Sequence, residues 1–262
     1  AALVRLPGLL SLWEDLHGWE YGYTRGLLQQ ELWKFDPAHQ GRIAALAWSH
    51  DGDRIASAGQ DRIVKIWDVG QRQLHEVCRG HTGWVRAVGF IDDGSRLLSL
   101  GEDGTARLWD ERRSWLPQVT ADDLTGLKVA AVSPTGRRWA WSDGRRVEVR
   151  ALENEEFLLQ QQNESADISA LGFDADEGRL AVADAADQTI TVQALDGSVS
   201  TVELGGVEGR CFALAFSLDG GRLAAGGTSG WLQVWDLDSQ RLVGRWSDAQ
   251  GTIYAIQFTD AP

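Results

Sequence analysis

Two groups of residues in this sequence combine an imidazole, a hydroxyl, a carboxylate and an indole at identical spacing. They are His39, Ser57, Asp61 and Trp67 in the first group, and His81, Ser99, Asp103 and Trp109 in the second. Imidazole, hydroxyl and carboxylate are the groups of a Ser–His–Asp hydrolase, in which the His accepts the proton of the nucleophilic Ser. A single active site does not require the same constellation twice, so the duplication favours a structural role over catalysis.

Other side chains that could support catalysis or bind a cofactor are arranged unfavourably. All five His lie before residue 82 and lack metal-ligand spacing, so no zinc site is expected. No Gly-rich loop follows a predicted strand and opens a helix, which argues against a nucleotide site. Carboxylate pairs such as Asp122 and Asp123 fit solvated turns better than acid–base catalysis. The sequence therefore predicts a protein without enzymatic activity, metal or cofactor.

The segments that hold these residues repeat with a period of 42 residues. Trp-Asp pairs begin at Trp67 and Trp109, one period apart, and another begins at Trp235, three periods later. Five glycines keep the same interval and are expected in turns: Gly52, Gly94, Gly136, Gly178 and Gly220.

Each period contains four short β signals separated by turns rich in Asp and Gly. In the second period the predicted strands cover residues 85–90, 96–100, 105–109 and 115–119. Four antiparallel strands per repeat of this length predict one blade of a β-propeller. One blade cannot bury both of its faces alone, so neighbouring blades must stack around an axis.

The repeats resemble those of the WD-repeat family through Gly80-His81, the Asp-Gly turns and the Trp-Asp ends. The resemblance covers residues 39–248 and is specific in the first two repeats but degraded in the other three. The repeats span residues 39–80, 81–122, 123–164, 165–206 and 207–248. The resemblance implies that in the first two repeats the Trp bonds to the Ser, the Ser to the His and the His to the Asp, which rigidifies the blade.

The later repeats lack this set of side chains. The fourth keeps only Asp187, and the fifth has Trp235 with Ala225 and Ser229 in place of the Ser and the Asp. We therefore expect the blades without the complete set to be looser by a few kcal/mol in sum, at about 1 kcal/mol for each missing hydrogen bond.

The two ends of the chain bear on the number of blades. Residues 249–262, with a strand near 253–258, are in phase to supply one strand of a sixth blade. Its other three strands would come from residues 12–15, 20–24 and 31–35. The favoured fold is therefore an all-β propeller of six four-stranded antiparallel blades. In that fold residues 37–262 form the propeller, and residues 1–36 form a closing segment that removes the exposed sheet edges.

A second interpretation of the N-terminal segment remains open. Its apolar residues also fit a helical stripe: Leu9, Leu12, Trp13, Leu16 and Tyr23. The segment "HGWEYGY" is similar to one that precedes WD-repeat regions in large bacterial signalling proteins, where it looks helical. On this interpretation residues 1–36 are a helical lead-in and the ring is an incomplete part of a seven-bladed propeller.

Composition narrows the partners and the setting. The chain has 25 basic and 38 acidic residues, a net charge of −13, which argues against nucleic acid and against anionic membranes. It shows no signal segment and no apolar stretch near the roughly 18 residues that span a bilayer. Cys78 and Cys211 fall in predicted strands and are expected to be buried free thiols, which fits a reducing cytoplasm. The chain contains no Met and opens at Ala1, so we expect an excised piece of something longer. Three Lys against 22 Arg fit a bacterial source, so the expected parent is a larger bacterial multidomain protein.

Residues at one mouth of the central channel are the predicted contact site, since binding residues favour loops on a rigid frame. At the repeat position of Trp84, the successive repeats carry Arg42, Trp84, Gly126, Asp167, Arg210 and Thr252. At the repeat position of Arg86, the successive repeats carry Ala44, Arg86, Lys128, Ser169, Phe212 and Tyr254. With two residues from adjacent turns, the predicted partner-binding set is Arg42, Gln60, Trp84, Arg86, Glu102, Lys128, Arg210, Phe212 and Tyr254. Arg and aromatic side chains together are typical of interface hot spots, so we expect a protein or an acidic or phosphorylated peptide to bind there.

The favoured function is therefore a non-catalytic protein–protein interaction scaffold or sensor module in signalling. A propeller enzyme, either a hydrolase or an oxidoreductase, is an alternative, although the channel positions are a poor metal cage. A structural packing module within an oligomer is another alternative.

A further basic run occurs in the third repeat. We expect its side chains to face solvent: Arg137, Arg138, Arg145, Arg146 and Arg150. Trp139 and Trp141 alternate within the same repeat and are expected to pack at least one face of that blade.

Overall fold

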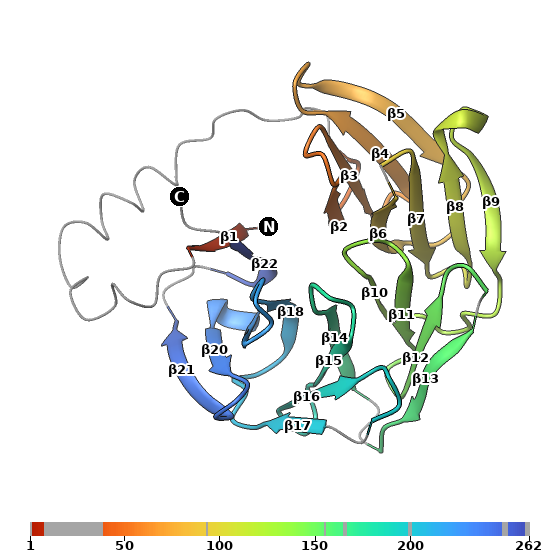
Figure 1. Ribbon diagram of the computed structural model, residues 1–262. Coiled ribbons are helices and arrows are strands. Elements are labelled where there is room, and N and C mark those ends of the chain that lie inside the picture. Colours follow the sequence, from red (N-terminus) through yellow and green to blue (C-terminus); the bar gives the residue numbers. More distant parts are fainter. Residues whose placement is uncertain are drawn as a thin grey trace, which may run out of the picture.

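Five four-stranded antiparallel sheets lie around a common centre and make up most of the computed structural model (Figure 1). The structure describes residues 2–7, 39–92, 94–154, 156–164, 167–198, 201–247 and 251–259. Within each sheet the strands pair in chain order, so every sheet is a meander and forms one blade. The prediction of an all-β propeller with four-stranded antiparallel blades is confirmed.

The strands of each blade follow one another along the chain. Blade 1 contains β2 (Ile43–Trp48), β3 (Arg54–Gly59), β4 (Ile63–Asp68) and β5 (Gln73–Arg79). Blade 2 contains β6 (Val85–Ile91), β7 (Arg96–Gly101), β8 (Ala106–Asp110) and β9 (Leu116–Ala121). Blade 3 contains β10 (Val129–Val132), β11 (Arg138–Ser142), β12 (Arg146–Ala151) and β13 (Phe157–Gln162). Blade 4 contains β14 (Ile168–Phe173), β15 (Arg179–Asp184), β16 (Thr189–Ala194) and β17 (Thr201–Leu204). Blade 5 contains β18 (Cys211–Phe216), β19 (Arg222–Gly227), β20 (Leu232–Asp236) and β21 (Arg241–Trp246). Short 3-10 helices lie at η1 (Glu111–Arg113) and η2 (Thr228–Gly230).

Large side chains of one blade pack against small or aliphatic side chains of the preceding blade. Trp109 of blade 2 lies in one cluster with Ala56 and Ile66 of blade 1. Trp139 and Trp141 of blade 3 are each 1% exposed and pack with leucines of blade 2, as the sequence predicted. Each Trp removes roughly 150–250 Å² from water, so these contacts between blades supply much of the core. The two cysteines are buried free thiols, also as predicted.

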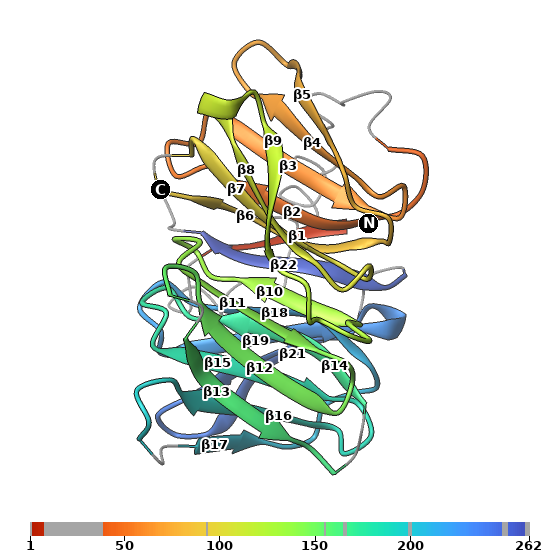
Figure 2. The same ribbon diagram turned by 90° about the vertical axis from the view of Figure 1, so that its right-hand side faces the viewer.

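The last described strand, β22 (Ile253–Thr259), agrees with the strand predicted near residues 253–258. Its side chains Ile253 and Ile256 pack against Ala213 and Val234 of blade 5. Figures 1 and 2 show it beside β1 (Ala2–Pro7), with which it pairs in parallel. The sequence did not predict this N-terminal strand.

Several predictions about the N-terminal segment cannot be compared with the structure. The strands predicted at residues 12–15, 20–24 and 31–35, and the alternative helix, lie outside the described residues. The number of six blades therefore stays a prediction beside five complete blades and β22.

The turn that follows the first strand of blade 4 differs in its backbone conformation from the corresponding turns of the other blades. In blades 1, 2, 3 and 5 the predicted glycines adopt positive φ: Gly52, Gly94, Gly136 and Gly220. In blade 4 the residue with positive φ is Glu177, at 58°, and not Gly178. The reason is a shift of one residue: the N–H of Glu177 bonds to the carbonyl of Asp174, just as the N–H of Gly136 bonds to that of Ser133. Gly178 therefore lies between β14 and β15 in the predicted turn, but it lacks the positive φ of the other four turn glycines.

Among the described residues, no helix has both the length and the apolar character that crossing a bilayer requires.

Candidate functional site

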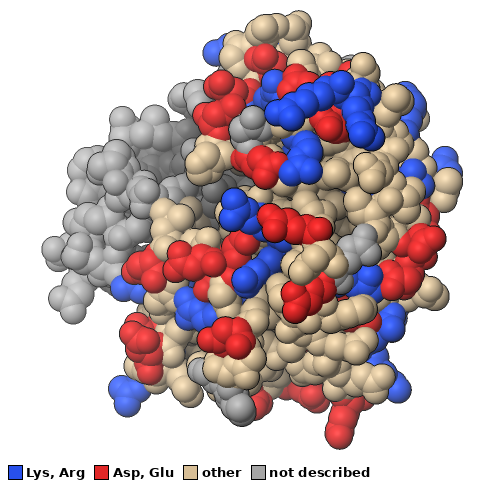
Figure 3. All heavy atoms as spheres, turned by 45° about the vertical axis from the view of Figure 1, so that its right-hand side comes forward, with Lys and Arg blue, Asp and Glu red and all other residues tan. Residues whose placement is uncertain are grey.

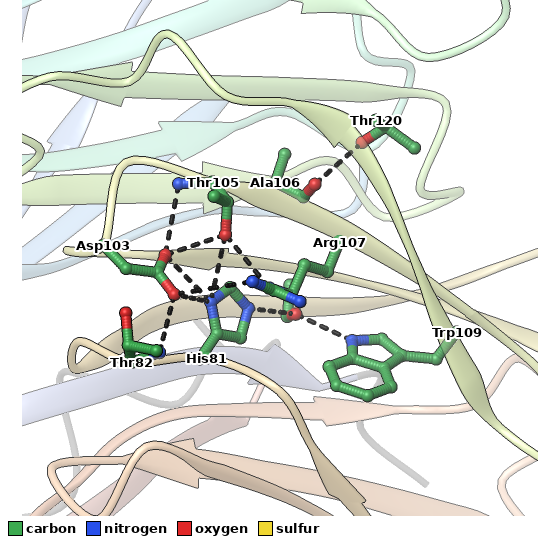
Figure 4. Close-up of polar contacts among 9 residues, drawn as sticks. His81, Thr82, Asp103, Thr105, Ala106, Arg107, Trp109 and Thr120 are labelled. Carbon is green, nitrogen blue, oxygen red and sulfur yellow. Dashed lines mark hydrogen bonds and ion pairs between the residues drawn. The ribbon is translucent and has the colours of Figure 1, made fainter.

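The four side chains of the second group meet in blade 2 in the order that the resemblance implies, and Figure 4 shows three of them, His81, Asp103 and Trp109. The indole of Trp109 donates to Oγ of Ser99 at 2.8 Å, and this Oγ lies 2.8 Å from Nε2 of His81. Nδ1 of His81 lies 3.0 Å from a carboxylate oxygen of Asp103. With the proton on Nδ1, each group donates to the next one along. The chain of hydrogen bonds runs from β8 through β7 to His81 in the loop before β6 and ends at Asp103 in the turn between β7 and β8.

Blade 1 repeats this arrangement. Trp67 donates to Oγ of Ser57 at 2.7 Å, Oγ lies 2.7 Å from Nε2 of His39, and Nδ1 of His39 lies 2.9 Å from Asp61. The chain has the same form because all four residues belong to one blade, whose strand register fixes their separation.

These chains have the order of a catalytic triad but not its accessibility. Ser57 is 2% exposed and Ser99 is fully buried, and each hydroxyl already accepts a hydrogen bond from an indole. A nucleophile must reach the substrate, so neither hydroxyl is placed to attack one. The chains instead tie the loop before each blade to its two central strands.

The electrostatics of the blade 2 chain fit this structural role. Burial lowers the pKa of His81 below its ordinary value, although Asp103 acts in the opposite direction. For Asp103, burial alone would raise the pKa. Hydrogen bonds from the Thr82 N–H, the Thr105 side chain and His81 outweigh it and lower the pKa to about 2. The pair is therefore a neutral imidazole that donates to an ionised carboxylate at neutral pH.

Blade 3 replaces the chain by buried ionic contacts, which the sequence analysis missed. Arg150 stands where blade 2 has Trp109, and it bonds to Glu148 at 3.1 Å and to Asp123 at 2.6 Å. Glu148 is 2% exposed and also accepts from the indole of Trp141 at 3.1 Å.

The prediction that the basic run of blade 3 faces solvent was therefore wrong for Arg150, which is 5% exposed and is stacked over Trp139. It was also wrong in part for two other arginines, since Arg146 pairs with Glu148 and Arg138 bonds to the carbonyl of Glu177. Arg137 and Arg145 are exposed as predicted.

Blade 5 uses a buried amide instead. The side chain of Gln233, 1% exposed, donates to the carbonyl of Gly206 at 3.0 Å and accepts from the N–H of Glu208 at 3.3 Å. This amide ties the loop before blade 5 to β20, as the His and Asp do in the first two blades. Blades 3 and 5 thus hold polar contacts of their own, which the expectation of looser blades did not include.

The predicted channel-mouth residues are placed by a backbone contact that recurs from blade to blade. The carbonyls of Arg42, Trp84 and Arg210 accept from N–H groups in the turn between the second and third strands of their own blades. In blades 1 and 5 a glycine at the end of the second strand leaves room for this close approach, whereas blade 4 makes the same contact from Ala185 to Asp167 after Asp184. A Cβ at Gly59 would lie 2.0 Å from the Arg42 carbonyl oxygen, and one at Gly227 would lie 1.8 Å from that of Arg210.

The second set of mouth residues lies in β-bulges. The strand register shifts at the positions of Ala44, Arg86, Ser169 and Phe212 against the next strand, and at Tyr254 against β1. A bulge locally re-aims a side chain and is common beside functional sites. The bulges therefore single out one residue at the same end of the innermost strands of blades 1, 2, 4 and 5 and of β22, whereas β10 of blade 3 pairs without a register shift.

In blade 2 three predicted site residues form one cluster. Arg86 stacks over the Trp84 ring with its guanidinium carbon 4.8 Å from the ring centroid. Its Nε donates to Glu102 at 2.7 Å. We call Trp84, Arg86 and Glu102 the blade 2 cluster.

A second cluster joins blade 4, blade 5 and β22. Arg210 pairs with Asp167 of blade 4 at 2.9 Å, and its guanidinium lies 5.9 Å from the Phe212 ring. Phe212 in turn contacts Tyr254 of β22, with ring centroids 5.4 Å apart and tilted by 36°. We call Asp167, Arg210, Phe212 and Tyr254 the seam cluster. Asp167 is a contact residue that the predicted binding set lacked, although its repeat position was known.

Among the described residues, the remaining predicted residues form no side-chain hydrogen bond, ion pair or ring contact with these two clusters. Arg42, Gln60 and Lys128 are exposed, and only the backbone N–H of Arg42 bonds to the amide of Gln60. Ser169 is buried, so its repeat position offers no accessible side chain. Figure 3 shows basic and acidic side chains interspersed over one face of the molecule. The four predicted cations therefore do not form one unneutralised basic cluster, since Arg86 and Arg210 are paired.

Two further features concern only the described part of the chain. No group of three or more His, Cys, Asp or Glu side chains there could hold a metal ion. A cavity of 520 Å³ lies on blade 1, and it is lined by His39, Gln40, Asp61, Ile63, Lys65, Leu74, Val77 and Arg79.

Comparison with known proteins agrees with the repeat structure. The family model described as "WD domain, G-beta repeat" matches residues 29–68, 72–110 and 198–236. These matches fall on the first two repeats and on the fifth, whose Trp-Asp pair ends the last match. A stretch of 31 residues, 12% of this chain, is 48% identical to the anaphase-promoting complex subunit cdc20 of Dictyostelium discoideum and spans 6% of that protein. WD40 repeats generally mediate contacts between proteins. With five four-stranded blades and these matches, the chain is a β-propeller of the WD-repeat family.

Proposed function

We propose that this chain is a protein-interaction scaffold, or the sensor module of a signalling protein, that captures an acidic segment of a partner at the channel mouth. The observation that carries the proposal is the placement of Arg and aromatic side chains at corresponding bulge and turn positions. These are Arg42 in blade 1, Trp84 and Arg86 in blade 2, Arg210 and Phe212 in blade 5, and Tyr254 in β22. Rigid blades hold these side chains in place before a partner arrives, which reduces the entropy lost on binding.

Two exposed cations support an acidic partner. Arg42 forms no ion pair with any described residue. The charge of Lys128 helps to lower the pKa of Asp143, but the two side chains form no ion pair. In a chain of net charge −13, such cations attract an acidic segment to one place while the rest of the surface repels it. A phosphorylated residue would serve as well as a carboxylate, because both are oxygen anions.

The paired arginines contribute in a different way. A guanidinium has five N–H donors, and Arg86 uses only its Nε and one terminal nitrogen on Glu102. The pairing keeps Arg86 over Trp84, so it presents the remaining donors from a fixed position. Arg210 is held in the same manner by Asp167.

The test uses the purified chain and a displayed library of random short peptides. We expect the selected peptides to be enriched in Asp and Glu. Changing both Arg42 and Lys128 to Glu should weaken the binding of a labelled selected peptide by about tenfold or more. The matched control changes Arg112 and Arg113 to Glu, which alters the net charge equally at the exposed residues of η1. Equal affinity of both double variants and of the unchanged chain would show that the acidic partner is wrong.

We propose the cytoplasm of a bacterium as the setting, within a larger multidomain protein. Two buried free thiols support a reducing compartment. The low number of Lys relative to Arg and the "HGWEYGY" segment support a bacterial source. Fractionation of the native host with an antibody against this chain, followed by size measurement of the detected protein, tests both parts.

A further inference from the structure

We propose that Phe212 and Tyr254 form an apolar subsite for one bulky apolar side chain of the partner segment, and that filling it holds β22 against blade 5. This inference rests on the proposed function and assigns the side chain that would follow or precede the acidic group.

The subsite is composite because its two rings come from different sheets. Phe212 lies at the start of β18 in blade 5, and Tyr254 lies at the start of β22, which pairs with β1. Their centroids are 5.4 Å apart at a tilt of 36°, and Tyr254 is 45% exposed. Exposed aromatic rings on a rigid frame offer a large apolar area at a low cost in conformational entropy.

The two sides of Phe212 differ in chemistry. On one side lies the guanidinium of Arg210, fixed by Asp167. On the other side lies Tyr254. The positive charge of Arg210 disfavours a second cation at this aromatic pair, whereas an apolar side chain flanked by a carboxylate or phosphate matches both the rings and the guanidinium. The structure therefore favours Leu, Phe or Trp beside an acidic residue.

The position of Tyr254 depends on how β22 docks. No backbone ladder joins β22 to blade 5 among the described strands, and the contact is made by Ile253, Ile256 and Phe258 against apolar side chains of that blade. Side-chain packing alone is easier to separate than a hydrogen-bonded ladder. A ligand that touches both Phe212 and Tyr254 binds only when β22 is docked, so by linkage it must stabilise the docked state.

The experiment uses the same peptide library selected on the unchanged chain. We expect selected peptides to carry a bulky apolar residue next to Asp or Glu. Changing Tyr254 to Ala should weaken the binding of a labelled selected peptide by about tenfold. The variant Tyr254→Phe should bind the peptide as tightly as the unchanged chain does, because the ring supplies the contact. Phe212→Leu, which keeps an apolar side chain in this half-buried place, should weaken binding less than Tyr254→Ala. Leu218→Ala, at a side chain 55% exposed in a turn of blade 5, is the matched control and should have no effect.

Hydrogen exchange of the amides in residues 253–259 tests the docking part. Saturating peptide should slow this exchange in the unchanged chain and leave it unaltered in Tyr254→Ala. If the amides of residues 253–259 exchange equally slowly with and without the peptide, the claim that the peptide holds β22 against blade 5 is wrong.

The outcomes separate the two proposals. Binding that is lost with Arg42 and Lys128 changed to Glu but kept in Tyr254→Ala would overturn the apolar subsite and leave the proposed function standing. The reverse pattern would keep the subsite and overturn the acidic partner. Failure to select any peptide on the unchanged chain would overturn both.

Discussion

The carboxylate of Glu177 in blade 4 accepts two hydrogen bonds from Thr135 in blade 3, one from the backbone N–H at 2.7 Å and one from the hydroxyl at 2.6 Å. Glu177 is 7% exposed and has a φ of 58°, which L residues other than Asn and Asp rarely adopt. The two hydrogen bonds offset the backbone strain at a turn position that is occupied by glycine in the other four blades.

We predict that Glu177→Ala lowers the free energy of unfolding by about 2–3 kcal/mol, since it removes both bonds and keeps the strained backbone. Glu177→Gly removes the same bonds but relieves the strain, so it should cost about 1 kcal/mol less. Denaturant unfolding of both variants measures the difference. Equal losses would show that the positive φ carries no cost here.

Two buried tryptophans offer a matched test of the hydrogen-bonded chains. The indole N–H of Trp109 is paired with Ser99, whereas that of Trp231 is buried without a partner among the described residues. Trp→Phe removes the same atoms at both positions, so the cavity cost is similar. We expect Trp109→Phe to be less stable than Trp231→Phe by about 1–3 kcal/mol in denaturant unfolding. A larger loss at Trp231 would contradict the assigned role of the chain.

The glycine at the end of the second strand of blade 5 sets the position of Arg210. In Gly227→Ala the new Cβ would lie 1.8 Å from the Arg210 carbonyl oxygen, so the loop that carries Arg210 must move. We expect a loss of about 3 kcal/mol in unfolding free energy and weaker binding of the selected peptides. Gly205→Ala is the control, because nothing lies within 4 Å of its added Cβ. Similar melting temperatures for the two variants would refute this argument.

The buried ions of blade 3 predict a non-additive pair of substitutions. Glu148→Leu leaves the guanidinium of Arg150 with Asp123 as its remaining ionic partner, and should cost about 3 kcal/mol. The double variant with Arg150→Leu as well should recover part of that loss, because apolar residues then replace both members of the Glu148–Arg150 pair, while Arg146 and Trp141 still lack their bonds to Glu148. Glu153→Ala, at an exposed position, controls for charge loss. The idea fails if the double variant is as unstable as the sum of its two single variants.

The blade 2 chain predicts how stability depends on pH. Burial lowers the pKa of His81 from its ordinary 6.5, so below that pH the unfolded chain binds a proton that the folded chain refuses. This part of the stability is complete above about pH 6.5 and is lost as the pH falls through the lower, folded pKa. Asp103, despite the opposing effect of burial, is held by its hydrogen bonds to a pKa of about 2. Its contribution is complete above the unfolded pKa of about 4 and is lost between there and pH 2.

Melting temperatures measured from pH 8 to acid should therefore be level first and then fall in two stages. The variant His81→Gln should lack the upper stage and keep the lower one. An unchanged slope below pH 6.5 in that variant would assign the upper stage to other groups.

The sequence alone predicted what lies within one blade. The period, the four strands per repeat and the chain from Trp109 to Asp103 depend on short separations, and the register of adjacent strands fixes these. The corresponding turn of blade 4 could not be predicted in this way: a one-residue shift before Asp174 keeps its bond to Arg179 but gives the positive φ to Glu177 instead of Gly178. Counting glycines could not detect that shift, because Gly178 kept its interval in the sequence.

Contacts between blades were decided only by the tertiary structure. Arg210 and Asp167 are 43 residues apart and meet because blades 4 and 5 stack, so their ion pair neutralises a cation that the sequence had left free. Arg150 was expected in solvent, yet Glu148 and Asp123 make its burial favourable from two different segments. Local periodicity tells which face of a strand a side chain occupies. Which charges face it from the next blade or from a distant loop depends on how the blades stack, and that is set by the packing of the whole ring.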